Sequence, residues 1–141
     1  MNLKPYAYYW TISSRIEKIK KDGLKVSGGL HLNGVYMTTN PYDFYEDPYY
    51  NSLFIVSLRG LEKNLVMFPT KKWVVSLKDI QPSNIYLVGQ NFENFEDLKN
   101  KLQVAKNNIK NYKRINWFQP SKIAHKYDEQ SRKIQKSISY V

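Results

Sequence analysis

The chain of 141 residues contains no cysteine, which excludes disulfides, thiolate metal ligands and cysteine nucleophiles. It has only two histidines, His31 and His125, and their distance in the sequence disfavours a histidine-rich metal site. No apolar run approaches the roughly 18 residues that a membrane-spanning helix requires. The first residues also lack the apolar segment of a secretory signal. We therefore expect a soluble cytoplasmic protein with no membrane partner and no bound metal.

Acidic residues are scarce in the last third of the chain. Residues 1–98 hold eleven Lys and Arg against ten Asp and Glu, whereas residues 99–141 hold eleven against two. The formal net charge is +10. A nearly neutral body followed by a basic segment favours a polyanionic partner, either nucleic acid or an acidic protein. Lysine-rich helices that are merely well solvated would give the same composition, so both interpretations stay open.

Hydrophobic residues make up 42% of the chain and aromatic residues 15%, as expected for one globular domain with a packed core. A short helix is predicted over 14–22, where Ser14 and Glu17 have the spacing of a capping box and Gly23 closes the helix. Alternating or apolar segments predict strands, with a further short strand near 65–68. These strands are expected at 6–11, 34–39, 53–58, 73–77 and 85–88.

The residues after Gly89 favour helices. An apolar stripe at helical spacing predicts one long helix, capped by Asn94 with Asp97. The stripe consists of Phe95, Leu98, Leu102, Ala105, Ile109 and Tyr112. A second helix is expected to start at Pro120. We therefore predict an α+β fold with a small mixed or antiparallel split sheet. Residues 1–90 would form the β-rich core, and residues 91–141 a basic helical extension packed on it.

Several short motifs follow one another in a characteristic order. The first strand holds Tyr8-Tyr9-Trp10-Thr11, the helix ends in Gly23-Leu24, and the second strand holds Gly34-Val35-Tyr36-Met37-Thr38. Trp73-Val74-Val75-Ser76-Leu77 and the turn of residues 80–85 come later. In this order the chain resembles the ADP-ribosyltransferase and RNA 2′-phosphotransferase superfamily. The resemblance implies a sheet core of that type.

The resemblance also implies a function, namely binding of NAD in a cleft between the first two strands and modification of a protein or nucleic-acid target. Tyr9 and Tyr36 would lie nearest the chemistry, with the ring of Tyr36 stacked on nicotinamide. The residues implied in cofactor binding are Tyr9, Thr11, Gly34, Tyr36 and Thr38. As an alternative, these aromatic residues are ordinary strand residues, because aromatic side chains favour strands.

The chain departs from the family pattern at two positions. Tyr9 stands where the family has histidine, and Lys72 stands where it commonly has a glutamate that stabilises the cationic sugar. Glu62 and Asp79 are nearby acids outside the motif. These departures favour, as an alternative, a catalytically decayed module that binds nucleic acid or a protein partner. Phosphate chemistry of the phosphotransferase branch would instead use basic residues, for which Lys71, Lys72 and His31 are candidates.

Two further groups of residues are candidates for binding. On a helical wheel, four lysines fall along one flank of the apolar stripe, and Arg114 and Trp117 follow at the helix end. Such a stripe can neutralise phosphates, and an exposed tryptophan can stack on a base. The nucleic-acid-binding candidates are Lys99, Lys106, Lys110, Lys113, Arg114 and Trp117. Asp43, Glu46 and Asp47 could coordinate a cation, although three acids in a loop are more often solvated.

Overall fold

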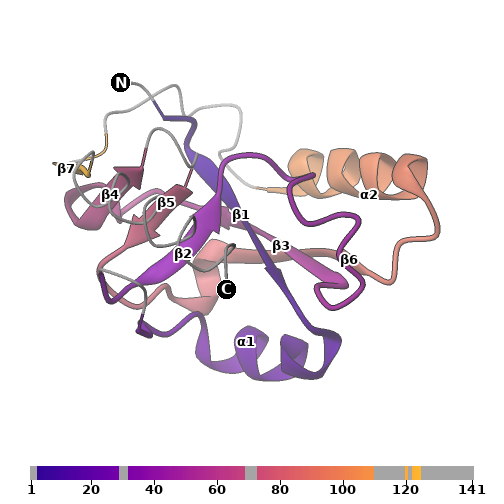
Figure 1. Ribbon diagram of the computed structural model, residues 1–141, viewed down its shortest axis with the longest axis horizontal. Coiled ribbons are helices and arrows are strands. Elements are labelled where there is room, and N and C mark those ends of the chain that lie inside the picture. Colours follow the sequence, from indigo (N-terminus) through magenta and orange to yellow (C-terminus); the bar gives the residue numbers. More distant parts are fainter. Residues whose placement is uncertain (1–2, 29–31, 69–72, 110–119, 121, 125–141) are drawn as a thin grey trace, which may run out of the picture.

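The computed structural model describes residues 3–28, 32–68, 73–109, 120 and 122–124. In these residues the chain forms an α+β fold around one sheet with strand order β6-β3-β1-β2-β5-β4-β7 (Figure 1). The strands are β1 (Tyr6–Thr11), β2 (Val35–Thr38), β3 (Ser52–Ser57), β4 (Leu65–Phe68), β5 (Trp73–Ser76), β6 (Ile85–Gln90) and β7 (Lys122–Ile123). The described helices are α1 (Ile16–Asp22) and α2 (Phe95–Asn108). The expected α+β class and antiparallel sheet are confirmed.

The sheet is divided near its middle, between β1 and β2. Strand β1 pairs with β3 along all six of its residues, and β2 pairs with β5 along all four. Between β1 and β2, in contrast, the one registered pair is Tyr8 with Thr38. All pairings among β1 to β6 are antiparallel, and the two-residue β7 runs parallel to β4. The short pairing lets the C-terminal end of β1 separate from the N-terminal end of β2.

Both faces of the sheet are covered, because side chains alternate along each strand. On one face, Ala7 and Phe54 pack with Ile16 and Ile19 of α1. The opposite face is covered in two separate parts. Tyr8 of β1 belongs to the part beneath α2, while the β4 and β5 side chains form the other with Ala124. This division of the second face coincides with the separation of β1 from β2.

Helix α1 begins at Ile16, two residues later than the sequence predicts. A 3₁₀ turn at Ser13–Arg15 precedes it, so Ser14 lies inside that turn instead of at the cap. The predicted capping box is therefore wrong, and neither helical segment has a side-chain cap there. The end of the helix is as predicted, because Gly23 has φ +80° and a Cβ at this position would meet the Ile80 carbonyl oxygen at 2.1 Å. Only glycine fits this turn.

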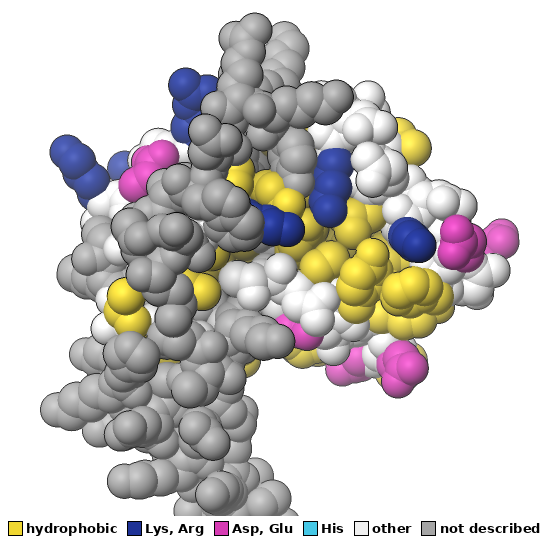
Figure 2. All heavy atoms as spheres, turned by 90° about the horizontal axis from the view of Figure 1, so that it is seen from above, with side chains coloured by type: hydrophobic (Ala, Val, Ile, Leu, Met, Phe, Trp, Pro, Cys, Tyr) yellow, Lys and Arg dark blue, Asp and Glu magenta, His cyan; other side chains and the backbone are white. Residues whose placement is uncertain are grey.

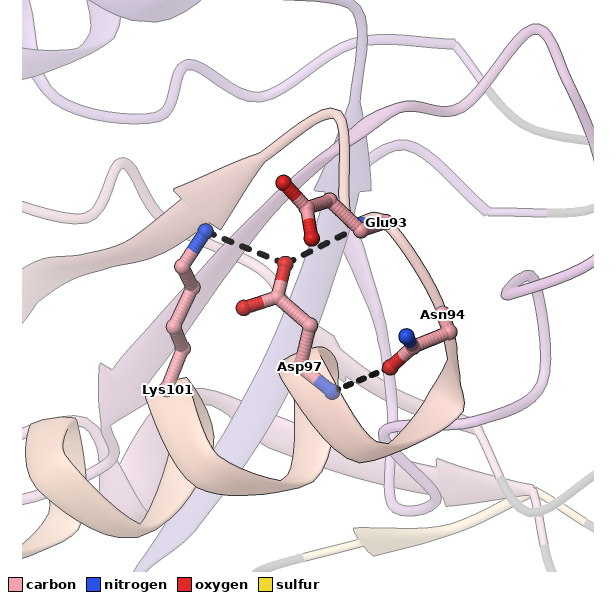
Figure 3. Close-up of polar contacts among 4 residues, drawn as sticks. All are labelled: Glu93, Asn94, Asp97 and Lys101. Carbon is pink, nitrogen blue, oxygen red and sulfur yellow. Dashed lines mark hydrogen bonds and ion pairs between the residues drawn. The ribbon is translucent and has the colours of Figure 1, made fainter.

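Helix α2 starts with the predicted cap (Figure 3). The Asn94 side-chain oxygen accepts a hydrogen bond of 2.8 Å from the Asp97 backbone N–H. The Asp97 carboxylate accepts one of 3.0 Å from the Glu93 backbone N–H and lies 3.2 Å from Lys101 Nζ. The Glu93 hydrogen bond, aided by Lys101, lowers the pKa of the Asp97 carboxyl from its ordinary value. Charge and backbone geometry thus agree in fixing where α2 begins.

The remainder of the predicted C-terminal region agrees only in part. Leu98 and Leu102 are buried as predicted, whereas Phe95 at the start of the stripe is 46% exposed. The helix ends at Asn108, because Ile109 already has extended backbone dihedral angles. The prediction of a helix that starts at Pro120 is wrong, because Lys122–Ile123 form the strand β7. Residues 125–141, where that helix was expected to continue, lie outside the described residues.

Candidate functional site

A cleft of about 400 Å³ opens where β1 and β2 separate. Its walls are rich in aromatic residues, and they come from β1, β2, β5, the segments on either side of α1 and the loop before β3. The aromatic lining residues are Tyr8, Tyr9, Trp10, Tyr36, Phe44, Tyr50 and Trp73. Arg15 and Lys25 are the charged lining residues, and no carboxylate is among the described residues of the lining. The cleft is therefore suited to a planar group and a negative charge.

Tyr36 is held firmly in the wall of the cleft. Its hydroxyl donates a hydrogen bond of 2.7 Å to the Leu32 carbonyl oxygen. Its ring lies edge-to-face against Trp73, with centroids 5.4 Å apart, and stacks at 6.4 Å on Phe68. Burial raises the pKa of this hydroxyl above its ordinary value, so the hydroxyl stays protonated near neutral pH. Tyr36 can offer its ring to a ligand, but its hydroxyl is already committed as a donor.

Arg15 stands next to Tyr9 at the side of the cleft. Arg15 Nη1 lies 3.5 Å from the Tyr9 hydroxyl oxygen, which accepts a long hydrogen bond. The 3₁₀ turn after β1 brings this guanidinium back over the strand that it follows. Only one nitrogen of its fork is used in that contact, so the others can donate to an anion.

Lys25, the second cation of the cleft, is held by an acid. Its Nζ lies 3.6 Å from one oxygen of Asp79, and both side chains are largely exposed. The other Asp79 oxygen accepts a 2.8 Å hydrogen bond from the Val26 backbone N–H. Asp79 therefore positions Lys25 and is itself engaged on both oxygens.

Thr38 links the cleft to a carboxylate outside its lining. The Thr38 hydroxyl is hydrogen-bonded to the Asp43 carboxylate and accepts a 3.1 Å hydrogen bond from the Asn40 backbone N–H. Both Thr38 and Thr11 are buried, each with an exposure of 3%. The turn at Asn40 and Asp43 thus fixes the edge of the cleft next to β2.

Four of the five residues implied in cofactor binding, Tyr9, Thr11, Tyr36 and Thr38, line this one cleft. Gly34 is not in the lining. A Cβ at Gly34 would meet the Ser76 carbonyl oxygen at 2.7 Å, so glycine is required for the close approach of β2 and β5. Packing of the strands therefore explains why glycine occupies position 34, without any contribution from a ligand.

Sequence reasoning did not select Arg15, Lys25, Phe44 or Tyr50, although all four line the cleft. Each comes from a turn or a loop, where no strand or helix periodicity indicates the direction of a side chain. The signal that could have found Arg15 is its place directly after the strand that carries Tyr9 and Thr11. The other three depend on how distant segments fold over the sheet.

Several predicted residues cannot be placed. His31, Lys71 and Lys72 lie outside the described residues, as do Lys110, Lys113, Arg114 and Trp117. Of the basic stripe, Lys99 and Lys106 are described, and both lie on α2. Lys106 Nζ lies 5.6 Å from the centroid of the Tyr6 ring, which Lys4 Nζ also approaches at 5.9 Å. Two cations therefore gather over one tyrosine at the junction of α2 and β1.

Within the described part of the chain, no three His, Asp or Glu side chains are grouped so that they could hold a metal ion. Likewise, no described helix has the length and apolar character to cross a membrane. Comparison of the chain with protein-family models, with curated proteins and with solved structures gave no match. By its fold and its cleft, the protein is an α+β protein with a divided antiparallel sheet. A cleft with aromatic and cationic lining residues lies at the division.

Proposed function

We propose that the protein binds a nucleotide in the cleft between β1 and β2, with NAD as the first candidate. The observation that carries the proposal is the lining of the cleft, which combines aromatic rings with Arg15 and Lys25 and holds no carboxylate among the described residues. A base or a nicotinamide ring can stack on the aromatic walls. A diphosphate can accept hydrogen bonds from the guanidinium and the ammonium group.

The positions of the aromatic and charged groups suit the two parts of such a ligand. Aromatic rings line both sides of the cleft, including Tyr9 from β1 and Tyr36 from β2, and Arg15 follows β1. A ligand with a ring at one end and phosphate at the other can therefore contact both walls. This arrangement supports the proposal that Tyr9, Thr11, Tyr36 and Thr38 contribute to a nucleotide site.

ADP-ribosyl transfer to a protein or nucleic-acid target is the second candidate function. The observation that favours it is the hydrogen bond between Thr38 and Asp43, which holds one carboxylate at the edge of the cleft. Transfer requires a negative charge near the ribose, because the sugar becomes cationic in the transition state. The described lining supplies none directly, so the geometry supports binding better than catalysis.

Calorimetric titration with NAD, ADP and adenosine tests the binding proposal. We expect NAD and ADP to bind more tightly than adenosine, because only the first two present phosphates to Arg15 and Lys25. Arg15→Ala should weaken ADP binding about five- to tenfold, as for the loss of one partly exposed charge-assisted hydrogen bond. Arg59→Ala is the matched control, since Arg59 is exposed and lies outside the cleft lining.

Equal affinity for adenosine and ADP, or equal losses in the two arginine variants, would contradict the proposal. The same samples can be assayed for release of nicotinamide from NAD. Release that disappears in Asp43→Asn would favour the transfer reaction, and tight binding without release would favour a binding module.

A further inference from the structure

A second cavity, of about 310 Å³, adjoins the nucleotide cleft. The two share Trp10 and Tyr50 in their linings, so these rings separate one space from the other. Tyr45 and Phe92 complete the aromatic part of the second lining. The cavity thus has four aromatic rings, contributed by β1, the loop of residues 42–50 and the segment after β6.

The walls of this cavity are held in place without a ligand. The Trp10 indole N–H donates a 2.9 Å hydrogen bond to the Pro41 carbonyl oxygen, and its ring lies edge-to-face against Phe92 at 5.9 Å. Asn91, which has φ +51°, donates from its backbone N–H to the Asn51 carbonyl oxygen at 2.8 Å. The Asn51 amide donates in turn to the Asn91 side-chain oxygen at 3.1 Å. The cavity is therefore preorganised.

The charge of the second lining is opposite to that of the first. Asp47 is its one charged residue among those described, whereas the nucleotide cleft has Arg15 and Lys25. One Asp47 oxygen accepts a 2.9 Å hydrogen bond from the Tyr49 backbone N–H, which fixes the carboxylate in its turn. Figure 2 shows one face of the molecule, where hydrophobic side chains toward the right have both acidic and basic side chains beside them. The second cavity is therefore suited to a cation.

The hydrogen-bonding groups of the lining restrict the kind of cation. The Asn51 side-chain oxygen already accepts from the Ser13 backbone N–H and from the Ser52 hydroxyl. The Asn91 side-chain oxygen accepts from Asn51. The aromatic rings and the Asp47 carboxylate of the lining can attract a cation that has no N–H donors of its own. Lys101 Nζ lies 5.5 Å from the centroid of the Phe92 ring, so this ring already attracts a cation of the protein.

We propose that this cavity binds a quaternary ammonium group. The aromatic rings attract the cation through their quadrupoles, and Asp47 adds a negative charge at the rim. The group could be carried by a free choline-type molecule or by a trimethylated lysine of another protein. The proposal does not rest on the proposed nucleotide binding, because Arg15 and Lys25 take no part in this lining, although Trp10 and Tyr50 line both cavities.

Titration calorimetry with choline and with its uncharged isostere 3,3-dimethylbutan-1-ol tests the chemistry. We expect choline to bind at least about tenfold more tightly than the isostere, because only choline carries the charge. Asp47→Asn should weaken choline binding severalfold and Phe92→Leu should weaken it further. Glu46→Gln should leave it unchanged, since Glu46 is a neighbouring acid outside the lining.

A short peptide with trimethyllysine, compared with the same peptide carrying unmodified lysine, distinguishes the two sources. Tighter binding of the methylated peptide than of choline assigns a protein partner, and binding of choline alone assigns a small molecule. Equal binding of choline and its isostere overturns the proposal, as does equal loss in Asp47→Asn and Glu46→Gln. Circular dichroism of each variant shows whether a loss reflects unfolding, and Arg59→Ala, which lies outside both linings, should bind choline as the parent does.

Discussion

At the scale of single residues, Tyr36 shows how one side chain can serve both the fold and the cleft. Its ring contacts Phe68 and Trp73, and its hydroxyl satisfies the Leu32 carbonyl oxygen. The ring remains part of the cleft lining. A role in stacking is therefore compatible with this geometry, whereas a role as a proton acceptor would require the hydroxyl to leave Leu32 and lose its proton.

Replacing Tyr36 by phenylalanine separates these roles. Tyr36→Phe leaves the Leu32 carbonyl without its donor, and we expect unfolding to become about 0.5–1.5 kcal/mol easier at neutral pH. Nucleotide binding should change little, because the ring is retained. Urea unfolding followed by circular dichroism measures the first effect, and calorimetry the second. A large loss of nucleotide binding in a folded Tyr36→Phe protein would instead show that the hydroxyl contacts the ligand.

The pH dependence of the free energy of unfolding provides a control for the stability effect of Tyr36→Phe. The pKa of Tyr36 is raised in the folded state, so the folded protein holds this proton more tightly than the unfolded chain does. The stability from this group is complete below the unfolded value of about 10 and is lost as the pH rises above it. We expect Tyr36→Phe to lack that part of the alkaline loss, so the stability difference between the two proteins should shrink above about pH 10.

At the scale of secondary-structure elements, α2 connects both cavities to the core. Its Leu98 and Leu102 pack with Leu53 and Ile55 of β3, beneath the same side of the sheet that carries Trp10. At the start of the helix, Phe95 contacts Tyr42 and Tyr45 at centroid distances of 4.9 and 5.7 Å. The helix therefore supports the loop that lines the second cavity.

Truncation of a buried side chain on α2 tests this support. Leu98 is completely buried, and we expect Leu98→Ala to destabilise the protein by about 2–5 kcal/mol through lost contacts and a cavity. Val104→Ala on the same helix is the control, since Val104 is 59% exposed and its loss should cost less than about 0.5 kcal/mol. Chemical denaturation measures both. Similar losses in the two variants would mean that α2 does not depend on this face for its docking.

At the scale of the whole molecule, charge is the dominant property. The formal net charge is +10, and residues 99–141, with eleven Lys and Arg against two Asp and Glu, account for nine of these charges. The described part of that segment supplies Lys106, which with Lys4 lies over Tyr6. This charge favours a polyanion as target or partner of the proposed nucleotide-binding protein.

Salt dependence tests that expectation. If three or four basic side chains contact the phosphates of a single-stranded oligonucleotide, affinity should fall roughly 20- to 50-fold between about 50 and 200 mM salt. Fluorescence anisotropy of a labelled oligonucleotide measures it. Lys99→Gln should weaken binding and lower the slope, whereas Lys18→Gln on α1 should not. An affinity that does not respond to salt would rule out the electrostatic interaction.

The sequence determined those features that depend on neighbouring residues. The apolar run of residues 53–58 indicates a strand buried on both faces, and β3 is buried along nearly its whole length. The cap at Asn94 and the glycine end of α1 follow from local hydrogen bonding and from a backbone angle that only glycine adopts readily. The net charge of +10 is likewise a property of composition alone.

Only the tertiary structure decided which residues share a cavity. Tyr50 and Trp73 are far from Arg15 in the chain, and they line one cleft with it because β1 and β2 pair at a single position and then separate. Phe95 is the first residue of the predicted apolar stripe, yet its ring packs on Tyr42 and Tyr45 and not among the core residues. It does so because the loop of residues 42–50 folds over it. Local periodicity specifies the face of an element, whereas contacts between distant segments depend on how the strands pair and where they part.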